Sequence, residues 1–110
     1  MLSGDIIRGY CDTMILFTLL HEDSYGYAIS KSIRETTGGQ YSMKETTLYS
    51  AIARLERNGC IAAYDGKTSF GRPRTYYTLT DSGRALYREK RDEWAVTRDV
   101  IGLFMEGDET

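Results

Sequence analysis

The sequence predicts a mainly helical α+β fold in which one small hairpin interrupts a series of helices. Apolar residues recur at helical spacing in four segments, residues 5–20, 25–36, 43–58 and 81–105. Two short runs rich in β-forming residues, 60–64 and 75–79, lie between the last two of these helices. A short helix followed at once by a hairpin with a basic tip is the layout of a winged helix-turn-helix domain, and we expect that fold.

The first predicted helix, residues 5–20, carries Tyr10, Met14 and Phe17 at spacings of four and three. Its second half, residues 14–20, is apolar nearly all round. A helix of that kind must be covered on more than one side. We therefore expect it to pack against the rest of the domain and against a second subunit.

The second predicted helix follows a polar break at residues 21–24, where Asp23 or Ser24 is expected to be the N-cap. Gly38-Gly39 is expected to end this helix, because glycine readily adopts the left-handed conformation found at helix C-termini. The short glycine-bearing turn that follows is typical of a helix-turn-helix.

The third predicted helix has signals at both ends. Ser42 and Glu45 have the spacing of a capping box, in which each side chain accepts a hydrogen bond from the other residue's backbone N–H. Gly59 can take the left-handed conformation just past the other end. We therefore expect a helix from Met43 to about Asn58.

This third helix has two chemically different faces. Its apolar positions follow the i, i+3, i+4, i+7 rule and are expected to point to the core: Leu48, Ala51, Ile52 and Leu55. The rest of its surface bears hydroxyl, phenol and cationic groups, which suit hydrogen bonds to bases and phosphates. The predicted DNA-contacting residues are Lys44, Thr46, Thr47, Tyr49, Ser50, Arg54 and Arg57. A solvated helix face could look the same, so this surface alone leaves both interpretations open.

Charge is distributed unevenly along the chain. The net charge of −2 by itself argues against nucleic-acid binding, which depends on cations that neutralise phosphates. However, residues 44–76 carry six cations and three anions, whereas residues 81–110 carry five cations and eight anions. The acidity therefore lies away from the predicted DNA-reading elements. The loop between the two strands contains the cations that we expect to meet phosphates on the wing, Lys67, Arg72 and Arg74.

The last helix is expected to start at Thr80 as N-cap, with Asp81 in the first turn, and to continue to about Met105. A helix of that length is longer than a domain of this size needs. Its aromatic and apolar residues recur at heptad-like spacing, at Tyr87, Trp94, Ile101 and Phe104. We expect this helix to dimerise by packing on the first helix of a partner; the alternative is that the stripe docks onto its own domain.

Length and composition indicate one compact unit of 110 residues. We expect residues 1–80 to form the DNA-binding domain, and residues 81–110 to form the dimerisation helix with a short acidic tail. The longest mostly apolar run, residues 14–20, is too short to span a bilayer, and the N-terminus does not have the pattern of a secretion signal. A cytoplasmic protein without a membrane partner is therefore expected.

The sequence does not have the residue clusters that catalysis needs. It contains one histidine, His21, and neither a nucleophile motif nor a phosphate-cradling loop before a helix. Cys11 and Cys60 do not have metal-ligand spacing and are expected to be buried thiols, which also disfavours a thiol switch. We expect a protein that is not an enzyme and that needs neither metal nor cofactor.

Three stretches in this order resemble the PadR family of transcriptional regulators: residues 25–29 (YGYAI), 47–61 (TLYSAIARLERNGCI) and 71–83 (GRPRTYYTLTDSG). The resemblance covers about residues 6–94. It implies a homodimer that inserts its two recognition helices into major grooves of a palindromic operator on double-stranded DNA, with each wing beside the neighbouring backbone. It also implies repression of nearby genes and release from DNA by a small molecule.

The chain is similar to the smaller members of that family, which have a single helix at the C-terminus. Some of these members hold planar ligands between paired tryptophans at the dimer interface, and Trp94 falls at the matching place. The residues expected to line such a site or the dimer interface are Tyr10, Met14, Phe17, Tyr87, Trp94, Ile101 and Phe104. The alternative is that these side chains only close the dimer core. For the whole protein, the competing interpretation is a winged-helix module that binds other proteins and does not bind DNA.

Overall fold

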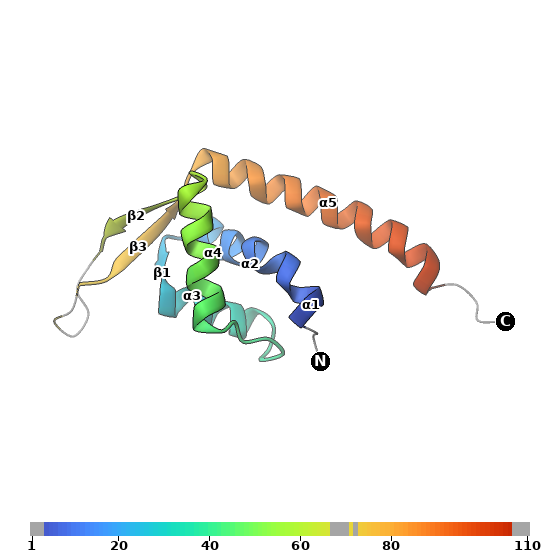
Figure 1. Cartoon of the computed structure of the whole chain (residues 1–110), viewed down its shortest axis with the longest axis horizontal. Helices are drawn as coiled ribbons and strands as arrows, with labels where there is room; N and C mark the ends of the chain where they lie inside the picture. Colours follow the sequence, from blue (N-terminus) through green and yellow to red (C-terminus); the bar gives the residue numbers. More distant parts are fainter. Residues whose placement is uncertain (1–3, 67–70, 72, 107–110) are drawn as a thin grey trace.

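The computed structural model describes residues 4–66, 71 and 73–106, and the fold is mainly helical with one small sheet (Figure 1). The elements follow the chain in the order α1 (Gly4–Ile7), the 3-10 helix η1 (Arg8–Tyr10), α2 (Cys11–His21), β1 (Ser24–Tyr25), α3 (Gly26–Thr36), α4 (Glu45–Arg57), β2 (Ile61–Asp65), β3 (Thr75–Leu79) and α5 (Asp81–Met105). The winged helix-turn-helix predicted from the sequence is confirmed: α3 and α4 form the helix-turn-helix, and β2 and β3 form the wing.

The first predicted helix is divided into α1, η1 and α2. The division lies at Gly9, a residue that destabilises a continuous helix because its backbone loses more freedom on folding than that of other residues. Beyond this point Ile15, Leu16 and Leu19 of α2 lie inside the core, while Met14, Phe17 and Leu20 are only partly buried.

The start of α3 differs from the prediction. Neither Asp23 nor Ser24 is its N-cap, because Ser24 and Tyr25 form β1, which pairs antiparallel with β3. The sheet therefore has three strands in the order β1-β3-β2, where the sequence predicted only a hairpin. Tyr25 is the N-cap residue of α3, and within the described chain its side chain forms no capping hydrogen bond.

The predicted capping box of α4 is wrong as well. The helix begins at Glu45, Lys44 is the N-cap residue, and among the described residues no side-chain cap is formed. Met43 is buried in the core, which holds the preceding segment extended and places Ser42 outside the helix. The predicted C-terminus is confirmed: Gly59 has φ 75°, and the Cys60 N–H donates to the Leu55 carbonyl at 2.9 Å.

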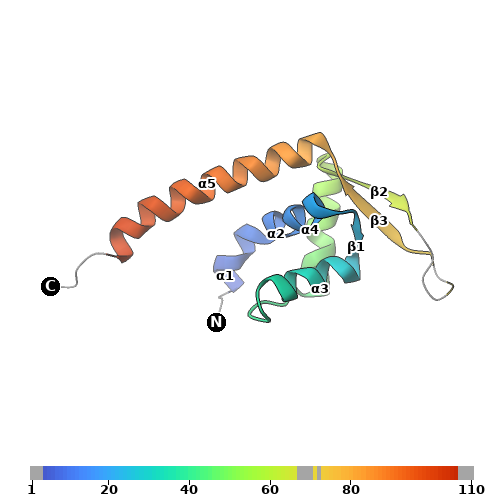
Figure 2. The ribbon, with the colours of Figure 1, turned by 180° about the vertical axis from the view of Figure 1, so that it is seen from behind.

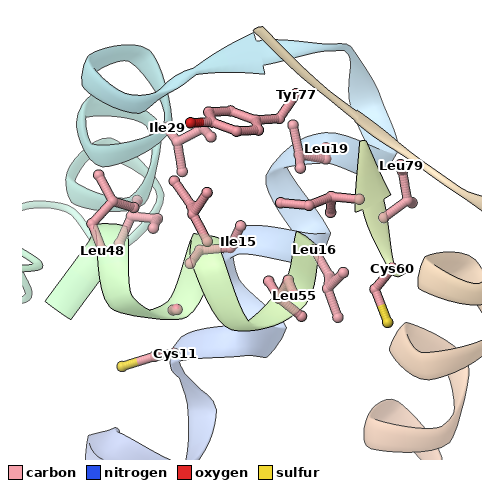
Figure 3. Close-up of a cluster of buried hydrophobic side chains, with 14 of the residues drawn as sticks. Cys11, Ile15, Leu16, Leu19, Ile29, Leu48, Leu55, Cys60, Tyr77 and Leu79 are labelled. Atoms are coloured by element: carbon pink, nitrogen blue, oxygen red, sulfur yellow. The ribbon is translucent and has the colours of Figure 1, made fainter. Parts of the chain in front are cut away.

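The core lies where α2, α3 and α4 meet the inner face of the sheet (Figure 3). All four predicted core positions of α4 are buried: Leu48, Ala51, Ile52 and Leu55. They meet Ile15 and Leu16 of α2 and Tyr77 and Leu79 of β3 in a single cluster. This burial fixes α4 with its other face directed outward.

The last helix begins as predicted. The Thr80 hydroxyl accepts from the Gly83 N–H at 3.1 Å and donates to the Gly59 carbonyl at 2.6 Å, which joins α5 to the end of α4. The first half of α5 lies along α2, and the second half projects beyond the domain (Figures 1 and 2). The molecule is consequently elongated, with extents of 63 × 28 × 21 Å.

Candidate nucleic-acid interface

The outward face of α4 carries most of the residues predicted to contact DNA. Thr46, Ser50 and Arg57 are exposed, and Thr47 is half-buried beside them. Lys44 is exposed just before the first turn, where backbone N–H groups favour an anion. The helix therefore presents short hydroxyls flanked by cations, a combination that can donate hydrogen bonds to base edges and phosphate oxygens.

Arg54 has a partner within the protein. Its guanidinium donates to the carboxylate of Asp12 on α2, and this hydrogen bond raises the pKa of Arg54 above its ordinary value. The Arg54 side chain keeps nearly half of its surface exposed, so the pair lies at the edge of the α4 face. Nothing in the local sequence indicates this pair, because its members are 42 residues apart.

A shallow surface pocket of about 290 Å³ lies between η1, α2 and α4. It is lined by Thr46, Thr47 and Ser50 together with Arg8 and Arg54. Arg8 was not predicted from the sequence, because only the tertiary structure brings it into one pocket with these hydroxyls; its guanidinium lies 3.5 Å from the carboxylate of Asp5. It adds a second cation next to the predicted base-reading residues.

Tyr49 leans toward α3. A Cβ atom at Gly26 would lie 2.7 Å from the Tyr49 Cζ atom, so the phenol occupies the space that glycine leaves at the start of α3. The Tyr49 side chain is 45% exposed and lines a groove with Tyr27 and Ser30. A residue predicted only as a DNA contact therefore also joins the two helices of the helix-turn-helix.

The wing is a regular antiparallel pair in which Ala63 lies opposite Tyr77 and Tyr64 lies opposite Tyr76. Two of the predicted wing cations, Lys67 and Arg72, lie outside the described residues. Arg74 directly precedes β3 at the loop end of the wing, where its carbonyl accepts from the Gly66 N–H at 2.8 Å and its guanidinium carbon is 4.3 Å from the centre of the Tyr25 ring.

The residues predicted for a dimer interface or an effector site divide into groups. Tyr10 and Trp94 meet edge to face with ring centroids 5.6 Å apart, and together with Tyr87 they line a largely apolar pocket of about 430 Å³. Met14, Phe17 and Tyr87 line a second pocket, of about 220 Å³, between α2, α3 and α5.

Ile101 and Phe104 lie on the projecting half of α5, away from both pockets. The heptad-like row predicted on the last helix therefore has two parts: Tyr87 and Trp94 pack against the domain, and Ile101 and Phe104 lie exposed beyond it.

The two cysteines are buried thiols, as predicted. The Cys11 Sγ atom lies 4.0 Å from the Tyr41 hydroxyl. The pKa of Tyr41 is raised, first by burial of the phenol and then by its electrostatic interaction and hydrogen bond with Cys11. The described residues contain no cluster of three or more side chains that could hold a metal ion. Nor do they include a helix with the length and apolar character needed to cross a lipid bilayer.

Comparison with known proteins gives one consistent result. The model of the "Transcriptional regulator PadR-like family" matches residues 15–89. A transcriptional regulator from Clostridium thermocellum is 52% identical, with a TM-score of 0.88 over 94% of this chain and 98% of that one. A PadR family transcription regulator from Clostridium difficile is 36% identical, with a TM-score of 0.77 over 88% of this chain and 99% of that one.

An uncharacterised protein of Lysinibacillus sphaericus is 45% identical over 107 residues, which cover 97% of this chain and 98% of the relative. The segment that matches the family model, residues 15–89, contains α3, α4 and the wing, together with most of α2 and the start of α5. PadR-like proteins are regulators of transcription and not enzymes. With a family match over more than half of its length and relatives of this identity, the chain belongs to the PadR-like family of transcriptional regulators.

Proposed function

We propose that the protein is a homodimeric repressor that binds a palindromic operator on double-stranded DNA and is released by a planar aromatic effector. The observation that carries the proposal is the pair of faces on α4. Leu48 and Leu55 anchor one face in the core, and the opposite face leaves Thr46, Ser50 and Arg57 exposed. A helix anchored in this way can enter a major groove without losing its packing.

The α4 residues have different proposed roles. Thr46, Thr47, Tyr49 and Ser50 read base edges or the adjoining sugar-phosphate wall, because their hydroxyl groups both donate and accept hydrogen bonds. The cations of the interface bind phosphates and supply affinity with little sequence information: Lys44, Arg54 and Arg57 on α4, Lys67, Arg72 and Arg74 on the wing, and Arg8 on η1.

The projecting half of α5 supports the homodimer. Its large apolar side chains are exposed in the single chain, with Phe104 at 80%: Val96, Val100, Ile101, Leu103, Phe104 and Met105. An exposed apolar segment of this kind marks an interaction surface. We propose that the first helix of a second copy of the chain covers it, so that residues 81–110 hold the dimer together and residues 1–80 of each subunit form one DNA-binding head. A regulator of this kind acts in the cytoplasm, together with the DNA that it binds.

The pocket at Trp94 supports the effector. Its lining combines the rings of Tyr10, Tyr87 and Trp94 with Lys90 and Arg91, so a planar aromatic molecule could stack there while a polar substituent meets a cation. Because Trp94 lies where α5 leaves the domain, a ligand here would change the angle between the two heads. Titration with planar aromatic compounds should quench the fluorescence of Trp94, the single tryptophan of the chain. If no compound quenches this fluorescence, the three rings have only a packing role and the effector site is refuted.

Selection of bound DNA from a random pool tests the central proposal. We expect a palindrome whose half-sites are about one helical turn apart. Mobility shifts at two salt concentrations should then show affinity falling steeply with salt, because bound phosphates release their counterions. A control with Thr46→Val and Ser50→Ala should lose preference for the selected sequence while it keeps the salt dependence. Recovery of no sequence would favour a module that binds other proteins.

A further inference from the structure

Three tyrosines form a row across the outer face of the sheet. Tyr76 is the cross-strand partner of both Tyr25 on β1 and Tyr64 on β2. The ring centroids are 5.3 Å apart for Tyr25 and Tyr76, and 5.9 Å apart for Tyr64 and Tyr76. Because side chains alternate along a strand, the neighbouring Tyr77 points to the opposite face and is buried in the core. The row therefore joins the wing to β1 on the side away from the core.

Arg74 extends this row. It lies two residues before Tyr76, so it shares the outer face and is the diagonal neighbour of Tyr25. Its guanidinium stacks over the Tyr25 ring at 4.3 Å. Its Nε atom is buried and has no hydrogen-bond partner in the described part of the chain. A side chain whose role was only to reach phosphate would keep all of its donors in water.

The other end of the row is fixed to the same short segment. The Tyr64 hydroxyl donates to the carboxylate of Asp23 at 2.7 Å, two residues before Tyr25. Gly66, at the end of β2, passes so close to Tyr76 that a Cβ atom there would lie 2.7 Å from the ring Cγ atom. The wing is thus held to residues 23–25 through side chains from both of its strands.

The next residue of that segment supports α4. Gly26 follows Tyr25 directly and receives the phenol of Tyr49, a residue of the recognition helix. Residues 23–26 therefore contact the wing on one side and α4 on the other. This four-residue segment therefore links the two DNA-reading elements, in addition to the direct contact of α4 with β2. Asp23 and Tyr25 supply its side-chain contacts with the wing.

We propose that Tyr25 and Arg74 are a positioning pair that sets the wing at the angle to α4 at which both meet one duplex. Arg74 positions the wing through the Tyr25 ring, in addition to the phosphate contact proposed for it above. The inference rests on the proposed DNA binding, which it deepens by assigning a role to two residues of that same interface.

The decisive variant is Tyr25→Leu, which removes the ring and leaves every charge in place. If the pair positions the wing, this variant should bind the selected operator about tenfold more weakly and with a lower salt slope, because the wing cations no longer reach their phosphates. Tyr25→Phe, which keeps the ring, should behave like the wild type. If Arg74 acts only on phosphate, Tyr25→Leu should leave affinity and salt slope unchanged, and that result overturns the proposal.

A double-mutant cycle with Arg74→Met provides a second criterion. If the two residues act as one pair, the losses of operator affinity should not add. The double variant should have an affinity within about twofold of that of whichever single variant binds the operator less tightly. Additive losses contradict the pair. Arg34→Met, which removes an exposed cation near the end of α3, is the matched control for loss of charge.

Hydrogen exchange in the free protein separates this proposal from the DNA-binding proposal. The amides of β2 and β3, including the Gly66 N–H that donates to the Arg74 carbonyl at 2.8 Å, should exchange faster in Tyr25→Leu and Arg74→Met alike. The core amides of α2 should be unaffected. If no DNA is bound but exchange changes in this way, only the proposed function fails. Unchanged exchange in the wing contradicts the positioning pair whether or not DNA is bound.

Discussion

Gly83 determines how closely α5 can approach the rest of the domain, and Gly83→Ala tests that approach. A Cβ atom at Gly83 would lie 2.6 Å from the Leu79 Cδ1 atom and closer still to the carbonyl oxygen of Cys60. The carbonyl belongs to the backbone at the start of β2 and cannot rotate away. The start of α5 must therefore move away from the Cys60 carbonyl, which also strains the hydrogen bond from the Gly83 N–H to the Thr80 hydroxyl.

The expected size of the effect combines two costs and one gain. Overpacking of this kind costs about 1–3 kcal/mol. Alanine gains about 1 kcal/mol over glycine inside a helix. Loss of the Thr80 cap costs about 1 kcal/mol more. We therefore expect Gly83→Ala to lower the free energy of unfolding by about 2 kcal/mol.

Gly102→Ala is the matched control in the same helix. Within the single chain a Cβ atom at Gly102 would meet nothing closer than Glu106 Oε2 at 3.7 Å, so the change acts there through helix propensity alone. This variant should be more stable than the wild type by up to about 1 kcal/mol. Chemical denaturation followed by far-UV circular dichroism, at one fixed protein concentration, measures both variants. Equal stability of Gly83→Ala and wild type would refute the close approach of α5 to Cys60.

Asp12→Asn should cost at most about 1 kcal/mol of stability, because its partner Arg54 is partly exposed. The same variant should bind random DNA more tightly in a filter-binding assay, because an anion is removed from the interface, and an unchanged affinity would contradict this. Phe104→Ser should leave the fold intact but raise the dimer dissociation constant by about tenfold or more, as measured by sedimentation equilibrium, whereas an unchanged constant would remove this residue from the interface. Burial raises the pKa of Tyr77 above 10.0, so its ionisation is disfavoured in the folded state, and stability should decline as pH rises above about 10. Tyr77→Phe should flatten that decline in urea midpoints, and an equally steep decline would show that other groups cause it.

Several features of the fold could be predicted because their causes are local. The faces of α4 follow from helical spacing, and its end follows from Gly59, which has the expected positive φ. The start of α5 follows from Thr80 and its bond to the Gly83 N–H. The order of a helix and a hairpin, together with the resemblance to PadR regulators, was sufficient to predict the winged helix-turn-helix.

The two capping predictions failed for a tertiary reason. Ser24 pairs with β3, so it cannot cap α3, and the burial of Met43 moves the start of α4 past Ser42. A two-residue strand has no pattern of its own in the sequence. Its pairing partner, Tyr77, is more than fifty residues away. The gain from burial and strand pairing exceeds the modest gain from a local cap.

The sequence by itself determined which side chains α4 turns outward and which it buries, because a helix places residues three and four apart on one face whatever surrounds it. Only the tertiary structure decided what those outward residues, and Arg74 of the wing, touch. Arg54 meets Asp12, Tyr49 covers Gly26 and Arg74 stacks on Tyr25, each across a long stretch of chain. Such pairs depend on how whole elements pack, and the chain encodes that packing through its entire core and not through any local spacing.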